Sequence, residues 1–253
     1  MRAGLTSVAI VALMATGAVA AGNKDKAAAP SKAAIAAALA DPARADQTGD
    51  DARRKAAEVI AFSGVRPGNS VIDLLPGQGY WTRIFTGVVG PKGHVYALWP
   101  AAAAKYAAKA LPALQARNLA NVTAQVLPTN VVAAPTPVDL VWTVQNYHDI
   151  PNDGVGEAGI DALNSEVFKA LKPGGTYVVI DHADAAGTGM SGTSTKHRID
   201  PAIVKTQVLK AGFKFVGASD ALRNPADDHS LKVFDPAIRG HTDQFIYKFR
   251  KPG

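Results

Sequence analysis

The side chains of this chain best suited to chemistry are histidines that stand next to charged residues. Asn146-Tyr147-His148-Asp149 and Asp181-His182 each place an imidazole beside a carboxylate. His197-Arg198 and Asp228-His229 add two further histidines with charged neighbours. Imidazole has the side-chain pKa closest to neutrality, so such pairs are typical of proton transfer. The sequence therefore predicts a general acid/base site.

The hypothesis assigns a role to each group. His148 is the base, Asp149 orients it, His182 or Tyr80 is the acid, and Arg198 or Arg223 holds an oxyanion. The other side chains expected to contact the substrate are Trp81, Trp99, Asn146, Tyr147, His197, Asp228 and His229. Each has a structural alternative: His148 could cap a helical turn, and the run from Arg223 to His229 could only brace a loop.

Several other kinds of site are excluded or disfavoured. The chain has no cysteine, which rules out thiolate catalysis and zinc–thiolate sites. It has neither a Gly-x-Ser-x-Gly elbow nor a phosphate loop with lysine. His148, His182 and a neighbouring carboxylate could hold a metal, but their spacing matches no two-histidine helix motif, so no metal is predicted. The net charge of +6 is scattered, so nucleic acid is not an expected partner.

Helices and strands are expected to alternate along the chain from residue 50. Expected helices are 51–62, 78–89, 101–117 (kinked or interrupted at Pro112), 157–171 and 201–211, the last with Asp200 as its N-cap. Expected strands are 70–74, 94–99, 122–127, 138–144, 176–181, 213–217 and 243–249. This order predicts a parallel sheet covered on both faces and closed by a hairpin. Ligands of such sheets bind at the carboxyl ends of the strands, where most of the residues above are expected.

The N-terminal residues resemble a signal peptide. Arg2 is followed by a mostly apolar run over residues 5–19, and Ala18-Val19-Ala20 fits a cleavage site. The alternative, a membrane anchor, needs a longer apolar run. We expect a signal peptide over 1–20, an Ala-rich tether or helix over 21–49 and one domain over 50–253. The expected location is the periplasm, without membrane attachment after cleavage, and a small molecule is the expected partner.

Three local motifs carry a resemblance to a known family. Asp73-x-x-x-Gly77-x-Gly79, Val138-Asp139-Leu140-Val141 and Leu171-Lys172-Pro173-Gly174-Gly175 resemble, in order, motifs of class I S-adenosylmethionine-dependent methyltransferases. The C-terminal part resembles exported bacterial proteins usually labelled predicted methyltransferases. The resemblance implies an α/β Rossmann-like fold with a seven-stranded, mostly parallel sheet and a C-terminal antiparallel hairpin. It also implies that Asp73, Gly77 and Gly79 lie around the cofactor, if that cofactor is used.

The chain departs from the family pattern at two places. Leu75 stands where the family has the first glycine of its turn, and Pro76 follows it. Trp99 stands where an acidic residue at the end of the second strand would bind the ribose hydroxyls, and an indole cannot accept a hydrogen bond. We therefore expect Leu75, Pro76 and Trp99 to close the groove in which the adenosyl group would lie.

These observations lead to three alternatives. The leading one is an exported, cofactor-independent lyase on the methyltransferase fold, for example one that releases an aldehyde from a small aromatic compound. The second is an S-adenosylmethionine-dependent methyltransferase of a small molecule. The third is a non-catalytic ligand-binding protein.

Overall fold

The computed structural model describes residue 1, residues 32–152 and residues 154–253. The predicted signal peptide and the first part of the predicted tether lie outside the described residues, and export stays a prediction. Among the described residues, none of the helices is both long and apolar enough to span a bilayer.

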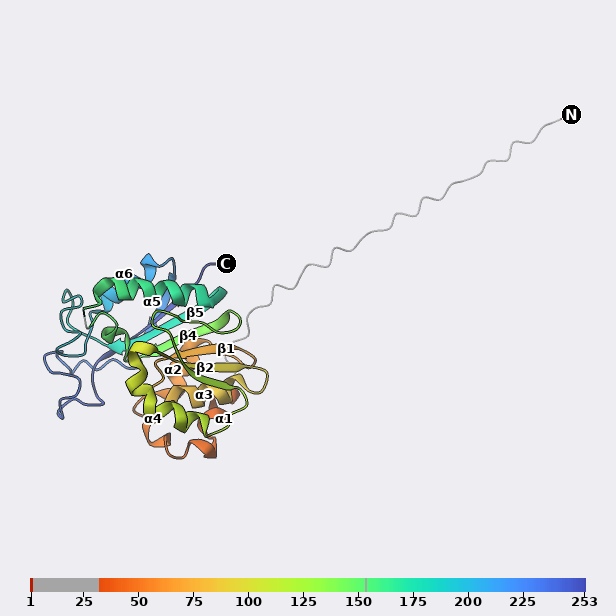
Figure 1. Ribbon diagram of the computed structural model, residues 1–253, viewed down its shortest axis with the longest axis horizontal. Coiled ribbons are helices and arrows are strands. Elements are labelled where there is room, and N and C mark those ends of the chain that lie inside the picture. The colour runs from red at the N-terminus through yellow and green to blue at the C-terminus, as the bar shows by residue number, and fades with distance from the viewer. Residues whose placement is uncertain (2–31, 153) are drawn as a thin grey trace.

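The chain folds around one seven-stranded sheet with the order β3-β2-β1-β4-β5-β7-β6 (Figure 1). The strands are β1 Ser70–Leu74, β2 His94–Pro100, β3 Val122–Leu127, β4 Val138–Val144, β5 Leu171–His182, β6 Lys214–Ser219 and β7 Gln244–Arg250. The first five run parallel, whereas β7 lies between β5 and β6 and is antiparallel to both. The predicted seven-stranded Rossmann-like methyltransferase fold with its terminal hairpin is confirmed.

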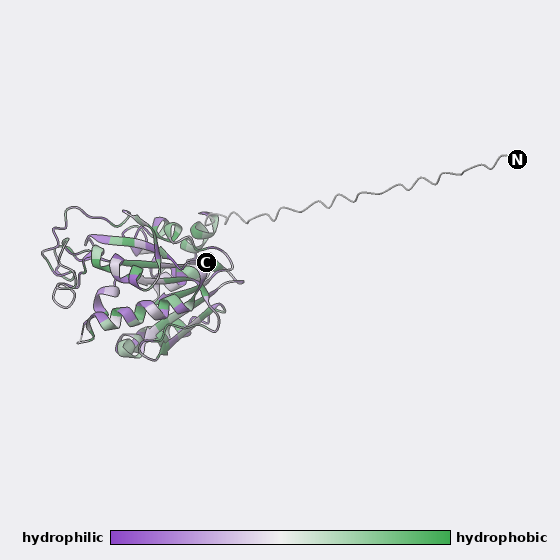
Figure 2. Cartoon of the chain, turned by 90° about the horizontal axis from the view of Figure 1, so that it is seen from above, coloured by the Kyte–Doolittle hydropathy of each residue, from purple (hydrophilic) through white to green (hydrophobic). Residues whose placement is uncertain are grey.

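Helices cover both faces of the sheet (Figure 1). They are α1 Lys32–Leu39, α2 Ala56–Ser63, α3 Tyr80–Val89, α4 Ala104–Gln115, α5 Gly156–Ala170 and α6 Pro201–Lys210. One face packs against α5 and α6, and the other against α1, α2 and α3. Most helices carry hydrophilic as well as hydrophobic residues (Figure 2). Successive side chains of a strand point to opposite faces of the sheet, so apolar side chains of the strands pack against helices in two layers.

Local sequence signals explain where several elements begin and end. Asp200 caps α6 as predicted, because its carboxylate accepts from the backbone N–H of Ala202 at 2.8 Å and Pro201 opens the helix. Helix α4 continues through Pro112 and ends at Gln115, so the predicted interruption does not occur. Strand β5 begins at Leu171, earlier than the predicted residue 176, with an irregular register where it first pairs with β4.

Residues 32–49 are part of the folded body. Helix α1 buries Ile35 and Ala38 against the cluster formed by α2 and α3. Arg83 of α3 pairs with Asp46 at 2.7 Å, and Arg44 pairs with Asp51 at the same distance. The packed domain therefore includes residues from Lys32 onward, ahead of the predicted boundary at residue 50.

Candidate functional site

A cleft of about 380 Å³ lies at the carboxyl ends of β1 and β4. This is the edge of a parallel sheet at which ligands bind, and the volume is in the range of small-molecule sites. Its walls are formed by Asp46, Gln47, Asp50, Arg54, Asp73, Leu75, Pro76, Gly77, Gln78, Tyr80, Trp81, Val144, Gln145 and Asn146.

The turn between β1 and α3 forms the floor of this cleft without closing it. Leu75 has φ +59°, in the left-handed region that favours glycine, and Gly77 and Gly79 have φ +56° and +75°. Leu75 therefore adopts the backbone conformation that a glycine would, while its side chain packs against the core. A Cβ built on Gly77 would meet nothing within 4 Å, so the backbone there is open. The expectation that Leu75 and Pro76 close the groove is wrong, since both line an open cleft.

Trp99 and Tyr147 lie in the core rather than in the wall of the cleft. The Trp99 ring is 1% exposed and packs with Ala107, Ala110 and Leu114 of α4. The Tyr147 ring is equally buried, and its hydroxyl oxygen accepts from the amide of Asn164 at 2.9 Å. The predictions that Trp99 blocks the groove and that both rings contact substrate are wrong, because helices α4 and α5 cover these rings.

Asp73 presents a buried carboxyl group to the cleft. The residue is 2% exposed, and the Thr82 hydroxyl donates to its Oδ2 at 2.6 Å. Burial raises the pKa of Asp73 to about 7, against the opposing effect of the hydrogen bonds from Thr82. The group is therefore poised to ionise when a positive charge binds beside it.

Three polar atoms around the cleft are buried without a hydrogen-bond partner in the described part of the chain. They are Oε1 of Gln47, Nε of Arg54 and Nε1 of Trp81. The carboxylate oxygen of Asp50 lies 3.6 Å from Arg54 Nε, beyond ordinary hydrogen-bond length. Buried polar atoms are nearly always paired, so a polar ligand in the cleft would complete this wall.

The hydroxyl group of Tyr80 is held by the N-terminal segment. It donates to Oδ1 of Asp51 at 2.6 Å, and the Arg54 guanidinium lies 4.6 Å from the ring centre. Burial and the Asp51 carboxylate raise the pKa of Tyr80 above its usual value. The predicted acid role is therefore disfavoured, because this proton is committed to Asp51 and bound more tightly than usual.

His148, Asp149 and His197 come together beside the cleft, in and next to the short helical turn η4 Tyr147–Asp149. Nε2 of His148 and Nδ1 of His197 each lie 3.3 Å from Oδ1 of Asp149. The rings of His148 and His197 meet edge to face with centres 5.4 Å apart. The predicted proximity of His148 and Asp149 is confirmed, and His197 joins them from a loop almost fifty positions later in the sequence.

The main carboxylate partner of His148 is Asp181 at the end of β5. Oδ1 of Asp181 lies 2.7 Å from Nδ1 of His148, and Oδ2 accepts from the backbone N–H of His148 at 2.8 Å. Sequence reasoning gave the orienting role to Asp149, because the β4–β5 pairing that brings Asp181 close is a long-range contact. Burial lowers the pKa of His148, but Asp181 and Asp149 outweigh it and raise this pKa to about 10. A ring protonated at neutral pH does not suit the predicted role of base.

The ring of His182 is paired with a hydroxyl group, whereas that of His148 is paired with a carboxylate. Its Nδ1 lies 2.7 Å from the Thr242 hydroxyl, and its ring centre is 5.9 Å from that of His148. Burial lowers the pKa of His182 to about 4. A neutral imidazole is a much weaker proton donor than an imidazolium ion, so its predicted acid role is disfavoured in this state.

Arg198, Arg223, Asp228 and His229 brace the loops after β5 and β6. Arg198 is fully buried. Its Nη2 donates to both carboxylate oxygens of Asp227 at 3.0 and 2.8 Å, and its Nε and Nη1 donate to backbone carbonyls. Arg223 and His229 both contact the buried carboxylate of Asp243, at 2.8 and 3.0 Å. Asp228 accepts from Ser230. The oxyanion role predicted for Arg198 is wrong, because a fully buried guanidinium with its donors occupied cannot reach substrate.

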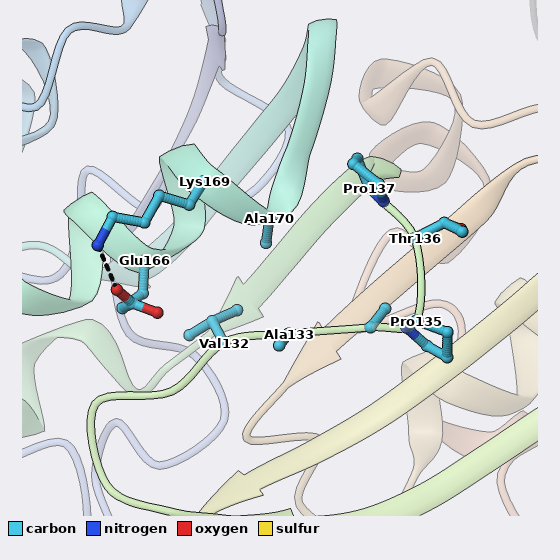
Figure 3. A pocket seen from close by; sticks show the side chains of 9 residues that line it. Val132, Ala133, Pro135, Thr136, Pro137, Glu166, Lys169 and Ala170 are labelled. Atoms are coloured by element: carbon cyan, nitrogen blue, oxygen red, sulfur yellow. Dashed lines mark hydrogen bonds and ion pairs between the residues drawn. The ribbon is translucent and has the colours of Figure 1, made fainter.

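A second hollow, of about 210 Å³, lies at the opposite, amino end of β4 (Figure 3). The segment from Val132 to Pro137 faces the last turn of α5, where Lys169 pairs with Glu166 at 2.7 Å. The histidine cluster follows the other end of β4, so the two regions lie at opposite ends of this strand, and the lining of the hollow carries no buried charged group.

Comparison with known proteins gives one curated relative and many structures of the same fold. No family model matches the chain. The ubiquinone/menaquinone biosynthesis C-methyltransferase UbiE of Ectopseudomonas mendocina is 32% identical over 194 residues, which are 75% of this chain and 65% of that protein. The chain thus spans less than two thirds of the length of this relative.

The similar solved structures include several methyltransferases and the [4+2]-cyclase SpnF, which has a TM-score of 0.58 and 17% identity, over 79% of this chain and 82% of that chain. A SAM-dependent methyltransferase from Aquifex aeolicus has a TM-score of 0.55 and 17% identity, over 87% of this chain and 97% of that chain. The glycopeptide N-methyltransferase MtfA, complexed with S-adenosylmethionine, has a TM-score of 0.51 and 15% identity, over 78% and 86%. At these identities the likeness establishes the class I methyltransferase fold.

The prediction of a cofactor-independent lyase is wrong. The curated relative is a methyltransferase, and the structures of the same fold include one with S-adenosylmethionine bound. The expectation that no cofactor is used rested on a closed groove, which the open cleft beside Asp73 contradicts. The second alternative, a methyltransferase, agrees better with both findings.

Proposed function

We propose that this protein is an S-adenosylmethionine-dependent methyltransferase that acts on a small planar aromatic compound. The observation that carries the proposal is the open cleft at the end of β1. In the turn that follows β1, Leu75 has the backbone conformation typical of glycine. The wall of the cleft also contains buried polar atoms without a hydrogen-bond partner among the described residues.

The charges around the cleft match those of the cofactor. S-Adenosylmethionine supplies a methyl group on a positively charged sulfur and carries an amino-acid end with one ammonium and one carboxylate. Asp46, Asp50 and Asp73 offer negative charge in the wall, and Arg54 offers the positive charge that the carboxylate needs. Trp81 offers a buried indole N–H and an aromatic surface. These residues bind and orient the donor, with Gly77 and Gly79 in the turn beneath it.

The departure at Trp99 weakens this binding without preventing it. An indole buried under α4 provides no acceptor for the ribose hydroxyls. Loss of one charge-assisted hydrogen bond, of about 1.5–3 kcal/mol, lowers affinity by roughly 10- to 150-fold. We therefore expect a dissociation constant of roughly 10–150 μM, taking about 1 μM for a fully paired site.

The acceptor side of the site is the region around His197. The Phe234 ring is 57% exposed and lies 4.9 Å, centre to centre, from the His197 ring. An exposed aromatic ring next to an imidazole favours a flat aromatic acceptor. His148 lies two residues after Asn146 of the cleft wall, so both parts of the site share one loop.

Calorimetry with S-adenosylmethionine tests the proposal. The whole chain should bind one equivalent, and Asp73→Ala should weaken binding at least tenfold by removing the only fully buried carboxyl in the cleft. Asp161→Ala is the matched control, because Asp161 pairs with Lys210 on the surface of α5. No heat at millimolar ligand would reject the proposal. Transfer of an isotopically labelled methyl group to a panel of phenols, quinones and aromatic acids tests the acceptor class.

A further inference from the structure

The cluster of His148, Asp149 and His197 has the geometry of a metal site. One nitrogen of each ring and one oxygen of the carboxylate lie within 4.8 Å of one another. The two separations that involve Asp149 Oδ1 are both 3.3 Å. They are longer than a charge-assisted hydrogen bond of about 2.8 Å. Ligands about 2.1 Å from a common ion lie about 3.0–3.4 Å apart, so these separations suit an ion between the three atoms.

The hydrogen bond from Asp181 fixes which nitrogen of His148 is available. Nδ1 of His148 lies 2.7 Å from Oδ1 of Asp181, and the latter residue is fully buried. The same carboxylate accepts from the backbone N–H groups of His148 and His182, both at 2.8 Å, so it cannot turn away. A carboxylate that holds one nitrogen of a histidine leaves the other directed at the ligand, which is the usual arrangement behind a metal. In this protein the other nitrogen is Nε2, which faces Asp149, and a bound ion takes the place of the proton that Nε2 carries in the metal-free charged ring.

The backbone at His197 is held in a conformation that disfavours a histidine. Its φ of +57° lies in the left-handed region, where a side chain with a Cβ costs about 1–2 kcal/mol relative to glycine. This conformation directs Nδ1 at Asp149 while the ring packs against Phe234. Non-glycine residues persist in such regions where the surroundings impose them, often at ligand sites.

We propose that His148 Nε2, His197 Nδ1 and Asp149 Oδ1 bind one divalent first-row transition metal ion, such as Zn²⁺. Two imidazoles and one carboxylate are a donor set that suits these metals and leaves coordination positions open. The side chains of Asp149 and His197 are 49% and 31% exposed, so water or an oxygen of a small molecule can reach those positions. Asp181 acts as a positioning residue behind His148. This inference is independent of whether the neighbouring cleft binds S-adenosylmethionine.

Titration with Co²⁺ tests the site, because this ion reports its ligands by visible absorption bands. The probe is Co²⁺ alone, added to the metal-free whole chain without an affinity tag. We expect one equivalent to bind, and Zn²⁺ to displace it. Asp149→Asn should weaken binding at least tenfold, and Asp181→Asn about 10- to 100-fold because the second carboxylate orients the ring.

His197→Gly is the decisive variant, since glycine accepts the positive φ and the fold should be preserved while one ligand is lost. His229→Gly is its matched control: His229 also has a positive φ, of +64°, but it contacts Asp243 outside the cluster. We expect the absorption bands to be lost in the first variant and kept in the second. Absence of bands at millimolar Co²⁺, or equal binding by His197→Gly and the unaltered chain, would overturn the proposal.

Discussion

The side-chain amide of Asn146 donates a hydrogen bond to the carbonyl oxygen of Leu75 at 3.0 Å. This contact joins the loop after β4 to the turn after β1, and both line the cleft. The backbone N–H of Leu75 also donates to the carbonyl of Leu98 at 2.8 Å. The turn is therefore held in its left-handed conformation from both sides, although it carries a leucine.

The strain at Leu75 can be measured with a pair of substitutions. Leu75→Ala and Leu75→Gly both remove the packed side chain, but only glycine relieves the cost of the φ of +59°. We expect the alanine variant to have a free energy of unfolding lower than the glycine variant by about 1 kcal/mol. Urea unfolding of the two variants gives the difference directly. An alanine variant at least as stable as the glycine variant would show that the turn is not strained.

The carboxyl group of Asp73 should make stability fall as the pH rises. Its pKa is about 7 in the folded protein against 3.8 for an ordinary aspartate, so the folded state favours the protonated form. Below pH 4 the group is protonated in both states and contributes nothing. Between about pH 4 and 7 the carboxyl group is ionised in the unfolded state but still protonated in the folded state. The free energy of unfolding therefore declines over this range, by about 4 kcal/mol at most. Asp73→Asn should remove this decline, as measured by thermal unfolding over that pH range.

The same group should couple cofactor binding to pH. A cation bound beside Asp73 favours its ionised form, so binding below pH 7 releases a proton. Affinity for S-adenosylmethionine should therefore rise up to tenfold per pH unit toward pH 7 and then level off. Calorimetry in buffers of different ionisation enthalpy counts the released proton. An affinity independent of pH between 5 and 7 would place the positive charge of the ligand away from Asp73.

The ion pairs Arg198–Asp227 and Arg223–Asp243 should differ sharply in their contribution to the free energy of unfolding. Asp227→Ala leaves the fully buried Arg198 without its carboxylate, which should cost about 3–5 kcal/mol. Arg223→Ala removes a half-exposed partner of Asp243 and should cost about 1 kcal/mol or less. Chemical unfolding of both variants tests this. Similar losses in the two would mean that the Arg198–Asp227 pair does not brace the loops.

The sequence was sufficient for the order of strands and helices because local patterns determine those elements. Alternation along β1 and β4, the cap at Asp200 and the Gly-containing turns each depend on a few neighbouring residues. The same patterns placed His148 and Asp149 at the correct edge of the sheet. The resemblance to methyltransferase motifs indicated Asp73, Gly77 and Gly79, of which Asp73 and Gly77 line the cleft.

Contacts between distant segments could not be predicted in the same way. Nothing near His148 in the sequence indicates that Asp181 holds its ring, or that His197 completes the cluster. Because Arg198 is charged, the sequence favoured a contact with ligand. In the fold its guanidinium is instead paired with Asp227 inside the protein. Leu75 was expected to block the groove from its residue type alone, but the outcome depends on a backbone angle set by its neighbours in space.

The docking of α1 on α3 should control the cleft from a distance. A Cβ added at Gly87 would lie 2.7 Å from Cβ and 3.0 Å from Cα of Ala38, so Gly87→Ala should push α1 away. Glycine to alanine inside a helix normally stabilises by about 1 kcal/mol, whereas overpacking here should destabilise by about 1–3 kcal/mol. The sign of the measured change in the free energy of unfolding therefore reports whether α1 is docked.

The same variant should also affect ligand binding and proteolysis. The segment after α1 supplies Asp46, Gln47 and Asp50 to the cleft wall, so Gly87→Ala should weaken S-adenosylmethionine binding although Gly87 itself is not in that wall. Trypsin should cleave faster after Arg44, which is 1% exposed when α1 is in place. Adding Ala38→Gly removes the closer of the two clashing atoms and should restore part of both losses. A single variant that is more stable, resists trypsin and binds normally would show that α1 does not support the cleft.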